Sequence, residues 1–265
     1  MMRIVLLLAV AALACGCPRP TTYNQPVAIQ TAQDVVARLA KARAARSSFR
    51  VETVMDYWLG KDRAKGTVYV MGTSKRQVRF NALRPDGEVL VDMACDGTNF
   101  TSVDRQNNCY LSGPCNKQSI ASLLRVDLEP DDFHDLAQGT PPVIANASGT
   151  ATWDATKGYL RVKLEGPDGK QTFVIDARDD RFDVVESELV DPAGKVAWSV
   201  VNAEFRTIQG VDHVAHRVPG KTRFKTPSQQ ADLLVEWKDD SRAINLPLDP
   251  AKFTVPIPDG LPVCR

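Results

Sequence analysis

The first residues to consider for catalysis or metal binding are the three histidines, His134, His213 and His216. His213 and His216 stand three residues apart in a stretch that alternates like a β-strand. Residues at that spacing point to opposite faces of a strand, so the two imidazoles should diverge. His134 shares a helical face with Asp131 and Asp135, but the positive end of the helix dipole accounts for carboxylates near a helix start. We therefore expect neither a metal site nor a cofactor.

Sequence motifs of the common enzyme classes are absent. The chain has no G-x-S-x-G, no H-E-x-x-H, no Walker loop and no dinucleotide-binding fingerprint. Its 33 basic and 32 acidic residues give a formal net charge of +1. Such a balanced charge creates no field that would attract nucleic acid. We therefore expect a protein that is not an enzyme and does not bind nucleic acid.

Two of the six cysteines, Cys15 and Cys17, end an apolar run over 4–14 that follows Arg3. This run is shorter than the roughly 20 residues that span a bilayer. With its basic start and small terminal residues it predicts a signal peptide over 1–16. Small residues directly before a cysteine resemble a bacterial lipobox, in which the cysteine becomes the acylated N-terminus. Acylation of Cys17 leaves four cysteines for two disulfides, whereas acylation of Cys15 leaves an odd thiol. We place the acyl chains on Cys17, with Cys15 as the alternative.

The other four cysteines predict two structural disulfides, as expected outside the cytoplasm. Four cysteines allow three pairings. Cys109 and Cys115 flank the short segment Tyr-Leu-Ser-Gly-Pro, which we interpret as a loop closed by a Cys109–Cys115 bond. Cys95 would then join Cys264 and fix the C-terminal tail to the fold. No C-x-x-C indicates a redox function.

Residues 17–30 are polar and rich in proline, which is typical of a flexible tether, and 31–265 are expected to form one domain. The domain begins with a helix, because Thr31 and Asp34 have the spacing of a capping box. Four basic residues lie mostly away from the apolar face of this helix. They are interpreted either as a solvated face or as contacts to anionic lipid headgroups: Arg38, Lys41, Arg43 and Arg46.

From Phe49 onward apolar and polar residues alternate, which is the period of β-strands. Strands are predicted over 49–57, 66–71, 76–80, 88–94, 98–103, 149–153, 159–164, 172–176, 182–190, 196–205, 212–218 and 233–237. Turn sequences such as GPDGK and DPAGK indicate antiparallel hairpins. A sheet of about ten or eleven strands must curl or close. Two short helices interrupt the strands, one around Ile120 and one that starts at Glu129 and ends at Gly139.

Three segments resemble the LolA and LolB superfamily of outer-membrane lipoprotein-sorting carriers. They are RQVRFNALRPDGEVLVDMACDGTNFTSVD, LLRVDLEPDDFHDLAQGTPP and the closing F-x-V-P-x-P-x-G, and the resemblance runs from about residue 31 to 263. It implies a mainly β fold, in which a curled antiparallel sheet forms an incomplete barrel and short helices act as a lid. The lipobox is similar to the lipid-anchored LolB-like branch. There, an exposed apolar residue between early strands serves membrane insertion, and Leu83 occupies the matching loop, followed by Arg84 and Pro85 where that pattern has a glycine.

The interpretation is a lipid-anchored outer-membrane protein facing the periplasm that binds lipid or lipoprotein acyl chains and assists their placement in the membrane. We expect a monomer, with a soluble periplasmic carrier as a further partner. The alternative is an envelope lipoprotein that keeps a packed interior and binds another protein. The residues predicted to surround the acyl chains lie on strands and on both short helices: Met55, Tyr57, Val68, Val70, Phe80, Leu90, Phe100, Leu123, Leu124, Phe133 and Leu136.

Overall fold

A computed structural model describes residues 22–26, 28–124 and 128–264. The expected signal peptide and both candidate acylation sites, Cys15 and Cys17, lie outside the described residues, as does part of the tether. No helix in the described part of the chain is long and apolar enough to cross a membrane.

The first described helix, α2 (Ala32–Ala44), begins at the capping box predicted from the sequence. The Thr31 hydroxyl accepts a hydrogen bond from the Asp34 amide at 3.1 Å, and the Asp34 carboxylate accepts one from the Thr31 amide at 2.8 Å. These contacts satisfy amides that have no partner within the helix. The apolar face of α2 is completely buried through Val35 and Leu39.

Among the described residues, fourteen strands form one antiparallel sheet in the order β6-β5-β4-β3-β2-β1-β15-β14-β11-β10-β9-β8-β7, with β16 paired to one end of β1. The strands are β1 (Ser48–Leu59), β2 (Asp62–Thr73), β3 (Gln77–Leu83), β4 (Val89–Asp96), β5 (Asn99–Asp104), β6 (Cys109–Pro114), β7 (Ser148–Asp154), β8 (Tyr159–Gly166), β9 (Gly169–Asp176), β10 (Asp183–Val190), β11 (Val196–Ala203), β14 (Lys221–Thr226), β15 (Ala231–Trp237) and β16 (Ala243–Ile244). The sheet therefore runs from the first half of the chain into the second through the pairing of β1 with β15.

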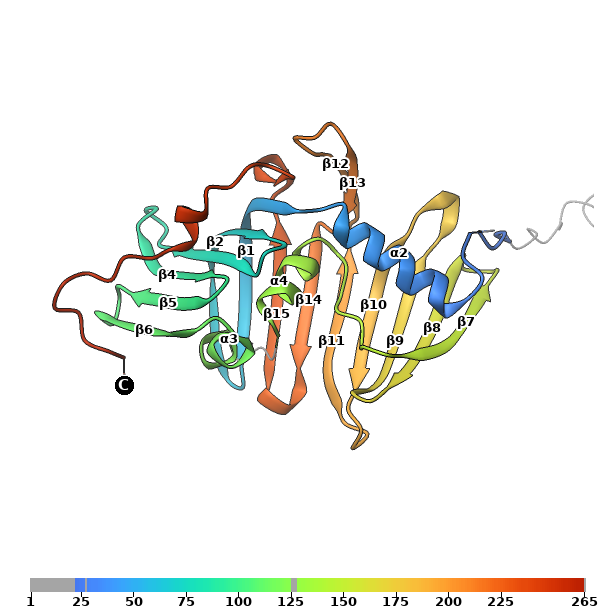
Figure 1. The fold of residues 1–265 in the computed structure, drawn as a ribbon, viewed down its shortest axis with the longest axis horizontal. Coiled ribbons are helices and arrows are strands. Elements are labelled where there is room, and N and C mark those ends of the chain that lie inside the picture. Colours follow the sequence, from blue (N-terminus) through green and yellow to red (C-terminus); the bar gives the residue numbers. More distant parts are fainter. Residues whose placement is uncertain (1–21, 27, 125–127, 265) are drawn as a thin grey trace, which may run out of the picture.

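One face of this sheet is apolar along its length. At one level the paired residues are Val162, Phe173, Ser187, Val200, Phe224, Leu233, Tyr57 and Ala64. Because side chains alternate across a strand, this row and its neighbours two residues away share one inner face. The sheet is curled but not closed, which confirms the predicted incomplete barrel (Figure 1).

Helices α2, α3 (Lys117–Leu124) and α4 (Pro130–Ala137) lie on one side of the sheet (Figure 1). Helix α2 contacts β7 and β8, and α4 contacts β2 and β3. The predicted start and end of α4 are confirmed, because Glu129 is its N-cap and Gly139 has a positive φ of 78°. A Cβ atom at Gly139 would lie 2.7 Å from the ring of Pro219, so a larger residue would not fit there.

Three strands in the sheet were not predicted: β6, β14 and the two-residue β16. Strand β14 carries a single large apolar residue, Phe224, among lysine, arginine and threonine. Strand β6 occupies the segment that we interpreted as a loop between two cysteines. A separate hairpin of β12 (Arg206–Gln209) and β13 (Ala215–Val218) projects beside the sheet, and short 3₁₀ turns connect the later elements: η1 (Arg178–Asp180), η2 (Pro227–Gln229), η3 (Asp239–Ser241) and η4 (Pro250–Phe253) (Figure 1).

The predicted disulfide pairing is wrong. Cys95 bonds to Cys115 and Cys109 bonds to Cys264, with Cα atoms 5.5 Å and 4.9 Å apart. Cys109 starts β6 and Cys115 directly follows it. Six residues of extended strand separate the two by roughly 20 Å, whereas bonded cysteines have Cα atoms about 4.4–6.8 Å apart. The C-terminal tail is nevertheless fixed to the sheet, since Cys264 lies beside Tyr110 through a backbone hydrogen bond of 2.8 Å.

Candidate functional site

An apolar cavity of about 280 Å³ lies between α4 and the inner face of the sheet. Strands β1 to β4 form one wall, and β14 and β15 form the other. The lining is almost entirely hydrocarbon, with few polar atoms exposed to the space. Such a space binds apolar ligands, because the hydrophobic effect favours removal of apolar surface from water.

Most of the residues predicted to surround acyl chains line this cavity. Strands β1 and β2 contribute Met55, Tyr57, Val68 and Val70. Strands β3 and β4 and helix α4 contribute four more: Phe80, Leu90, Phe133 and Leu136. Phe100 is buried in the neighbouring core around the Cys95–Cys115 bond and is not among the lining residues. The side chains of Leu123 and Leu124 lie outside the described residues.

Helix α4 closes the cavity on the side away from the sheet. Phe133 meets Phe80 edge-on, with ring centroids 5.5 Å apart, and Leu136 is buried against Trp198 and Phe224. Edge-to-face aromatic contacts of this kind stabilise packing by about 0.5–1.5 kcal/mol beyond buried area. An isolated helix of eight residues is not stable in water, so α4 depends on these contacts.

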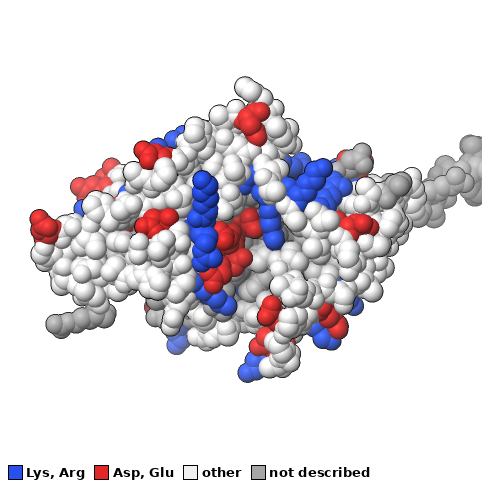
Figure 2. Space-filling model, viewed as in Figure 1, with Lys and Arg blue, Asp and Glu red and all other residues white. Residues whose placement is uncertain are grey.

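Ion pairs hold α4 at both ends. At its start, Arg76 lies 2.9 Å from Glu129 and 3.7 Å from Asp131. At its end, Arg43 of α2 lies 2.9 Å from Asp135. Figure 2 shows this arrangement on the surface, where acidic side chains gather at the centre of the face with basic side chains on both sides.

Burial changes the pKa of several charged groups around α4. Desolvation raises the pKa of Asp132 to about 6 and also raises that of Asp131. Desolvation lowers the pKa of Arg46 to about 10, although Asp135 and Asp183 act in the opposite direction. Arg46 donates hydrogen bonds to the carbonyls of Gln138 at 2.7 Å and Arg217 at 3.0 Å. Arg43 and Arg46 are therefore structural contacts to α4 and the loop after it.

The end of the cavity away from α4 is built from small residues and a β-bulge. Ala64, Gly66 and Ala82 occupy the wall here. The register between β3 and β4 shifts after Ala82, so Leu83 pairs with Val89. A bulge bends the strand and redirects its side chains. The expectation of Leu83 as an exposed loop residue is wrong: Leu83 ends β3, is half-buried and lines the cavity, while the exposed tip of the hairpin is formed by 84–88.

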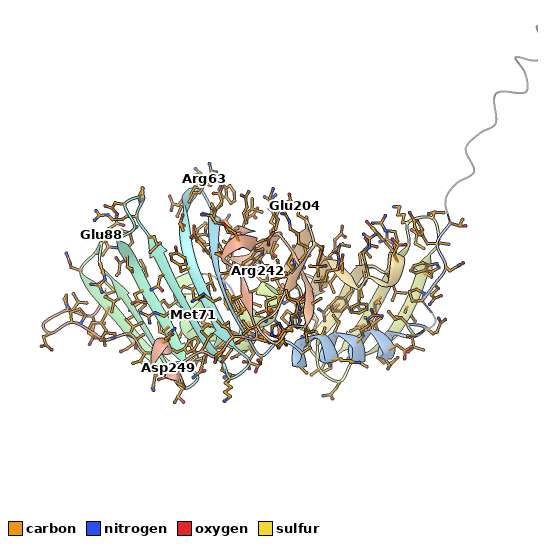
Figure 3. The ribbon with its side chains drawn as sticks, turned by 90° about the horizontal axis from the view of Figure 1, so that it is seen from above. Arg63, Met71, Glu88, Glu204, Arg242 and Asp249 are labelled. Atoms are coloured by element: carbon orange, nitrogen blue, oxygen red, sulfur yellow. A yellow bond between two sulfur atoms is a disulfide. The ribbon has the colours of Figure 1, made fainter. Side chains whose placement is uncertain are left out.

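The strand order and Figure 3 show at which end of the strands this part of the cavity lies. Arg63 follows the β1–β2 turn and Glu88 closes the β3–β4 turn, and both lie at the same end of the strands in Figure 3. Met71 lies toward the other end (Figure 3). Helix α4 covers the level of Phe49 and Phe80, so the Arg63 and Glu88 end is the uncovered one.

Comparison with known proteins supports the fold. No protein-family model matches the sequence, and no curated protein matches it. A LolA-superfamily protein of Nitrosomonas europaea has a TM-score of 0.55 at 12% identity, and the match covers 86% of this chain and 99% of that one. The chain has the LolA-superfamily fold.

Two further solved structures share this fold. A DUF1329 family protein of Desulfovibrio piger has a TM-score of 0.55 at 13% identity, covering 84% of this chain and 95% of that one. A domain of Vibrio parahaemolyticus named for outer-membrane lipoprotein sorting has a TM-score of 0.53 at 10% identity, covering 82% and 94%. At these identities the likeness extends to the fold.

The histidines do not converge on this LolA-type scaffold. His213 lies in the β12–β13 turn and is exposed, whereas His216 is buried on β13, 3.6 Å from Asp212. The prediction put both on one strand, but only His216 lies on one. His134 is buried 3.2 Å from Asp135, and Asp131 pairs with Arg76 instead. No group of three metal-ligating side chains occurs among the residues that the structure describes.

Sequence reasoning missed the second wall of the cavity. Strands β14 and β15 supply Thr222, Phe224, Leu233, Val235 and Trp237. The segment Lys-Thr-Arg-Phe-Lys-Thr of β14 does alternate, with basic residues on the outer face. Its inward side chains are two threonines and one phenylalanine, so hydrophobicity alone did not mark it as a strand.

Proposed function

We propose that this protein is a non-enzymatic carrier that binds acyl chains of lipids or lipoproteins in the cavity under α4. The observation that supports the proposal is the cavity itself: an apolar space of about 280 Å³ that side chains of the fold leave unfilled. Each methylene group moved from water into such a space contributes about 0.8 kcal/mol. A chain of moderate length therefore binds without any polar contact.

We also propose that the carrier is anchored to the outer membrane by acyl chains on Cys17 and works in the periplasm. The lipobox-like sequence before Cys17 supports this, and two disulfides fit an oxidising compartment. Two or more acyl chains give stable membrane attachment. The anchor and the LolB-like mode of action belong together, because an anchored carrier releases its cargo at the membrane that holds it.

Leu83 is the proposed point of cargo release. It lines the uncovered end of the cavity and precedes the exposed hairpin tip. An acyl chain leaving the cavity at this end would pass over Leu83 and reach the membrane without crossing water. Leu83→Glu should therefore block transfer of cargo while the folded protein still accumulates in the envelope.

Photochemical labelling in cells tests the carrier function. Cells that produce the full chain are grown with a palmitic acid carrying a photoreactive diazirine, which enters phospholipids and lipoproteins. After irradiation we expect cross-links on peptides that contain Met55, Leu90 or Phe133. Ala82→Phe fills the wall of the cavity and should lower these cross-links at least tenfold.

The matched control is Ala203→Phe, because Ala203 is exposed on β11. It should leave the labelling unchanged. Labelling of the cavity peptides that is absent, or that Ala82→Phe does not alter, would overturn the carrier proposal and favour a protein-interaction module instead.

A further inference from the structure

A second hollow adjoins the uncovered end of the acyl-chain cavity. Charged and polar side chains share its lining with two apolar ones, and we call it the polar hollow. It is lined by the β3–β4 hairpin and the turn after β5: Arg84, Glu88, Val89, Leu90, Arg105 and Gln106. Leu90 lines both spaces, so the two are adjacent.

Backbone pairing fixes the position of the two arginines relative to the cavity. The amide of Arg105 donates a hydrogen bond of 2.8 Å to the carbonyl of Leu90, so Arg105 lies directly across from a residue that lines the cavity. The amide of Arg84 donates one of 2.8 Å to the carbonyl of Glu88 and directly follows Leu83. The backbone of each arginine is therefore adjacent to a residue that lines the apolar cavity.

The charge in the polar hollow is not balanced. Arg84 forms an ion pair of 2.9 Å with Glu88. Arg105 is exposed and has no carboxylate partner among the described residues. Two guanidinium groups against one carboxylate leave a positive charge beside an apolar cavity. Guanidinium groups bind carboxylate and phosphate through paired hydrogen bonds.

We infer that the ligand is a single-chain anionic amphiphile, whose acyl chain fills the cavity and whose carboxylate or phosphate headgroup is held by Arg105 in the polar hollow. The inference rests on the proposed carrier function and specifies its ligand. The cavity volume of about 280 Å³ lies just below the usual range of small-molecule pockets, about 300–1,000 Å³, so it favours one acyl chain over two or more. A cationic headgroup is disfavoured by the same charge, and a neutral one gains nothing from Arg105.

The test uses membranes that contain the full chain, treated with four added photoreactive probes of the same chain length. They are palmitic acid, palmitoyl lysophosphatidic acid, hexadecanol and monopalmitoylglycerol. We expect the two anions to label the cavity peptides several times more strongly than the two neutral compounds. Arg105→Gln should lower labelling by the anions about fivefold, near the upper limit for an exposed ion pair, and leave the neutral probes unchanged.

Arg161→Gln is the matched control, because Arg161 is an exposed strand residue in the other half of the sheet. Stronger labelling by palmitic acid identifies the bound headgroup as a fatty-acid carboxylate. Stronger labelling by lysophosphatidic acid identifies it as a lipid phosphate. Equal labelling by anions and neutral compounds, or equal loss of both in Arg105→Gln, would overturn the headgroup assignment while the cavity function stands. If none of the four probes labels the cavity peptides, the carrier proposal itself is wrong.

Discussion

The inner face of the sheet is filled under α2 and hollow under α4. In the α2 half, Leu39 of the helix and Leu160 and Ile175 of the sheet have no exposed surface. In the α4 half, the inner side chains surround a cavity of about 280 Å³. Both halves belong to one continuous sheet.

The difference arises from residue size and helix length. The inner positions of β8 are Leu160, Val162 and Leu164, whereas the corresponding end of β2 carries Ala64 and Gly66. Helix α2 has 13 residues and α4 has eight. A short helix that stops before these small residues leaves space that a longer helix over aliphatic residues would fill. This fold therefore forms a binding site where its core is incompletely packed.

The hollow half also carries both described disulfides. Cys95–Cys115 lies within the core beside the cavity, and Cys109–Cys264 fixes the tail to β6. The half with the cavity has fewer van der Waals contacts to stabilise it. Covalent links that restrict the unfolded chain compensate for that loss.

Removal of the tail disulfide should have the largest effect on stability. The bond between Cys109 and Cys264 spans a sequence separation of 155 residues. Long closed loops give the largest stabilisation, so Cys109→Ser with Cys264→Ser should lower the free energy of unfolding by about 5 kcal/mol. Urea unfolding of the full chain measures it. Hydrogen exchange should show faster opening of β5 and β6 than of β8 and β9, and equal acceleration in both halves would contradict the comparison.

Matched leucine truncations compare the two halves directly. Leu160→Ala, in the filled half, creates a new cavity and should lower the free energy of unfolding by about 4 kcal/mol. Leu233→Ala, on the wall of the existing cavity, should lower it by about 1 kcal/mol, because its side chain already faces open space. The same urea titration measures both variants. Similar losses for the two would mean that the cavity is filled in solution.

The pH dependence of stability should be concentrated in the hollow half through Asp132. Its pKa is raised from 3.8 to about 6 by burial, so between these values the folded state binds more protons than the unfolded state. Stability contributed by this group therefore falls as pH rises through that window. Asp132→Asn should be more stable than the unmodified protein by about 3 kcal/mol at pH 7.5 and equally stable at pH 3. A difference that persists unchanged at pH 3 would show that the charge is not its cause.

The fold was largely predictable because it depends on periodicity, which a sequence displays. The capping box at Thr31, most of the alternating strands and the start of α4 at Glu129 were confirmed. Most cavity residues were found for the same reason, since inward positions alternate along β1, β2 and β3. Strand β14 escaped because its inward residues Thr222 and Thr226 are not hydrophobic.

The rest depends on contacts between distant segments, which periodicity does not encode. The disulfide pairing follows from β6 being a strand and from the tail returning to Tyr110. The polar hollow depends on the bulge that brings Leu90 beside Arg105. The contacts of Arg43 and Arg46 with α4 join residues about ninety positions apart, and a sequence pattern marks them only as basic.

The smallest effect concerns the connection between the two halves. Arg43 of α2 and Asp135 of α4 form an ion pair of 2.9 Å, and both side chains are partly exposed. Arg43 also donates to the Pro141 carbonyl and Asp135 contacts His134, so each single substitution removes more than the pair. A double-mutant cycle with Arg43→Gln and Asp135→Asn isolates the pair, and we expect a coupling energy of about 0.5 kcal/mol. A measured coupling of zero would mean that this ion pair does not hold α4, which would then depend on Arg76, Arg46 and its apolar contacts.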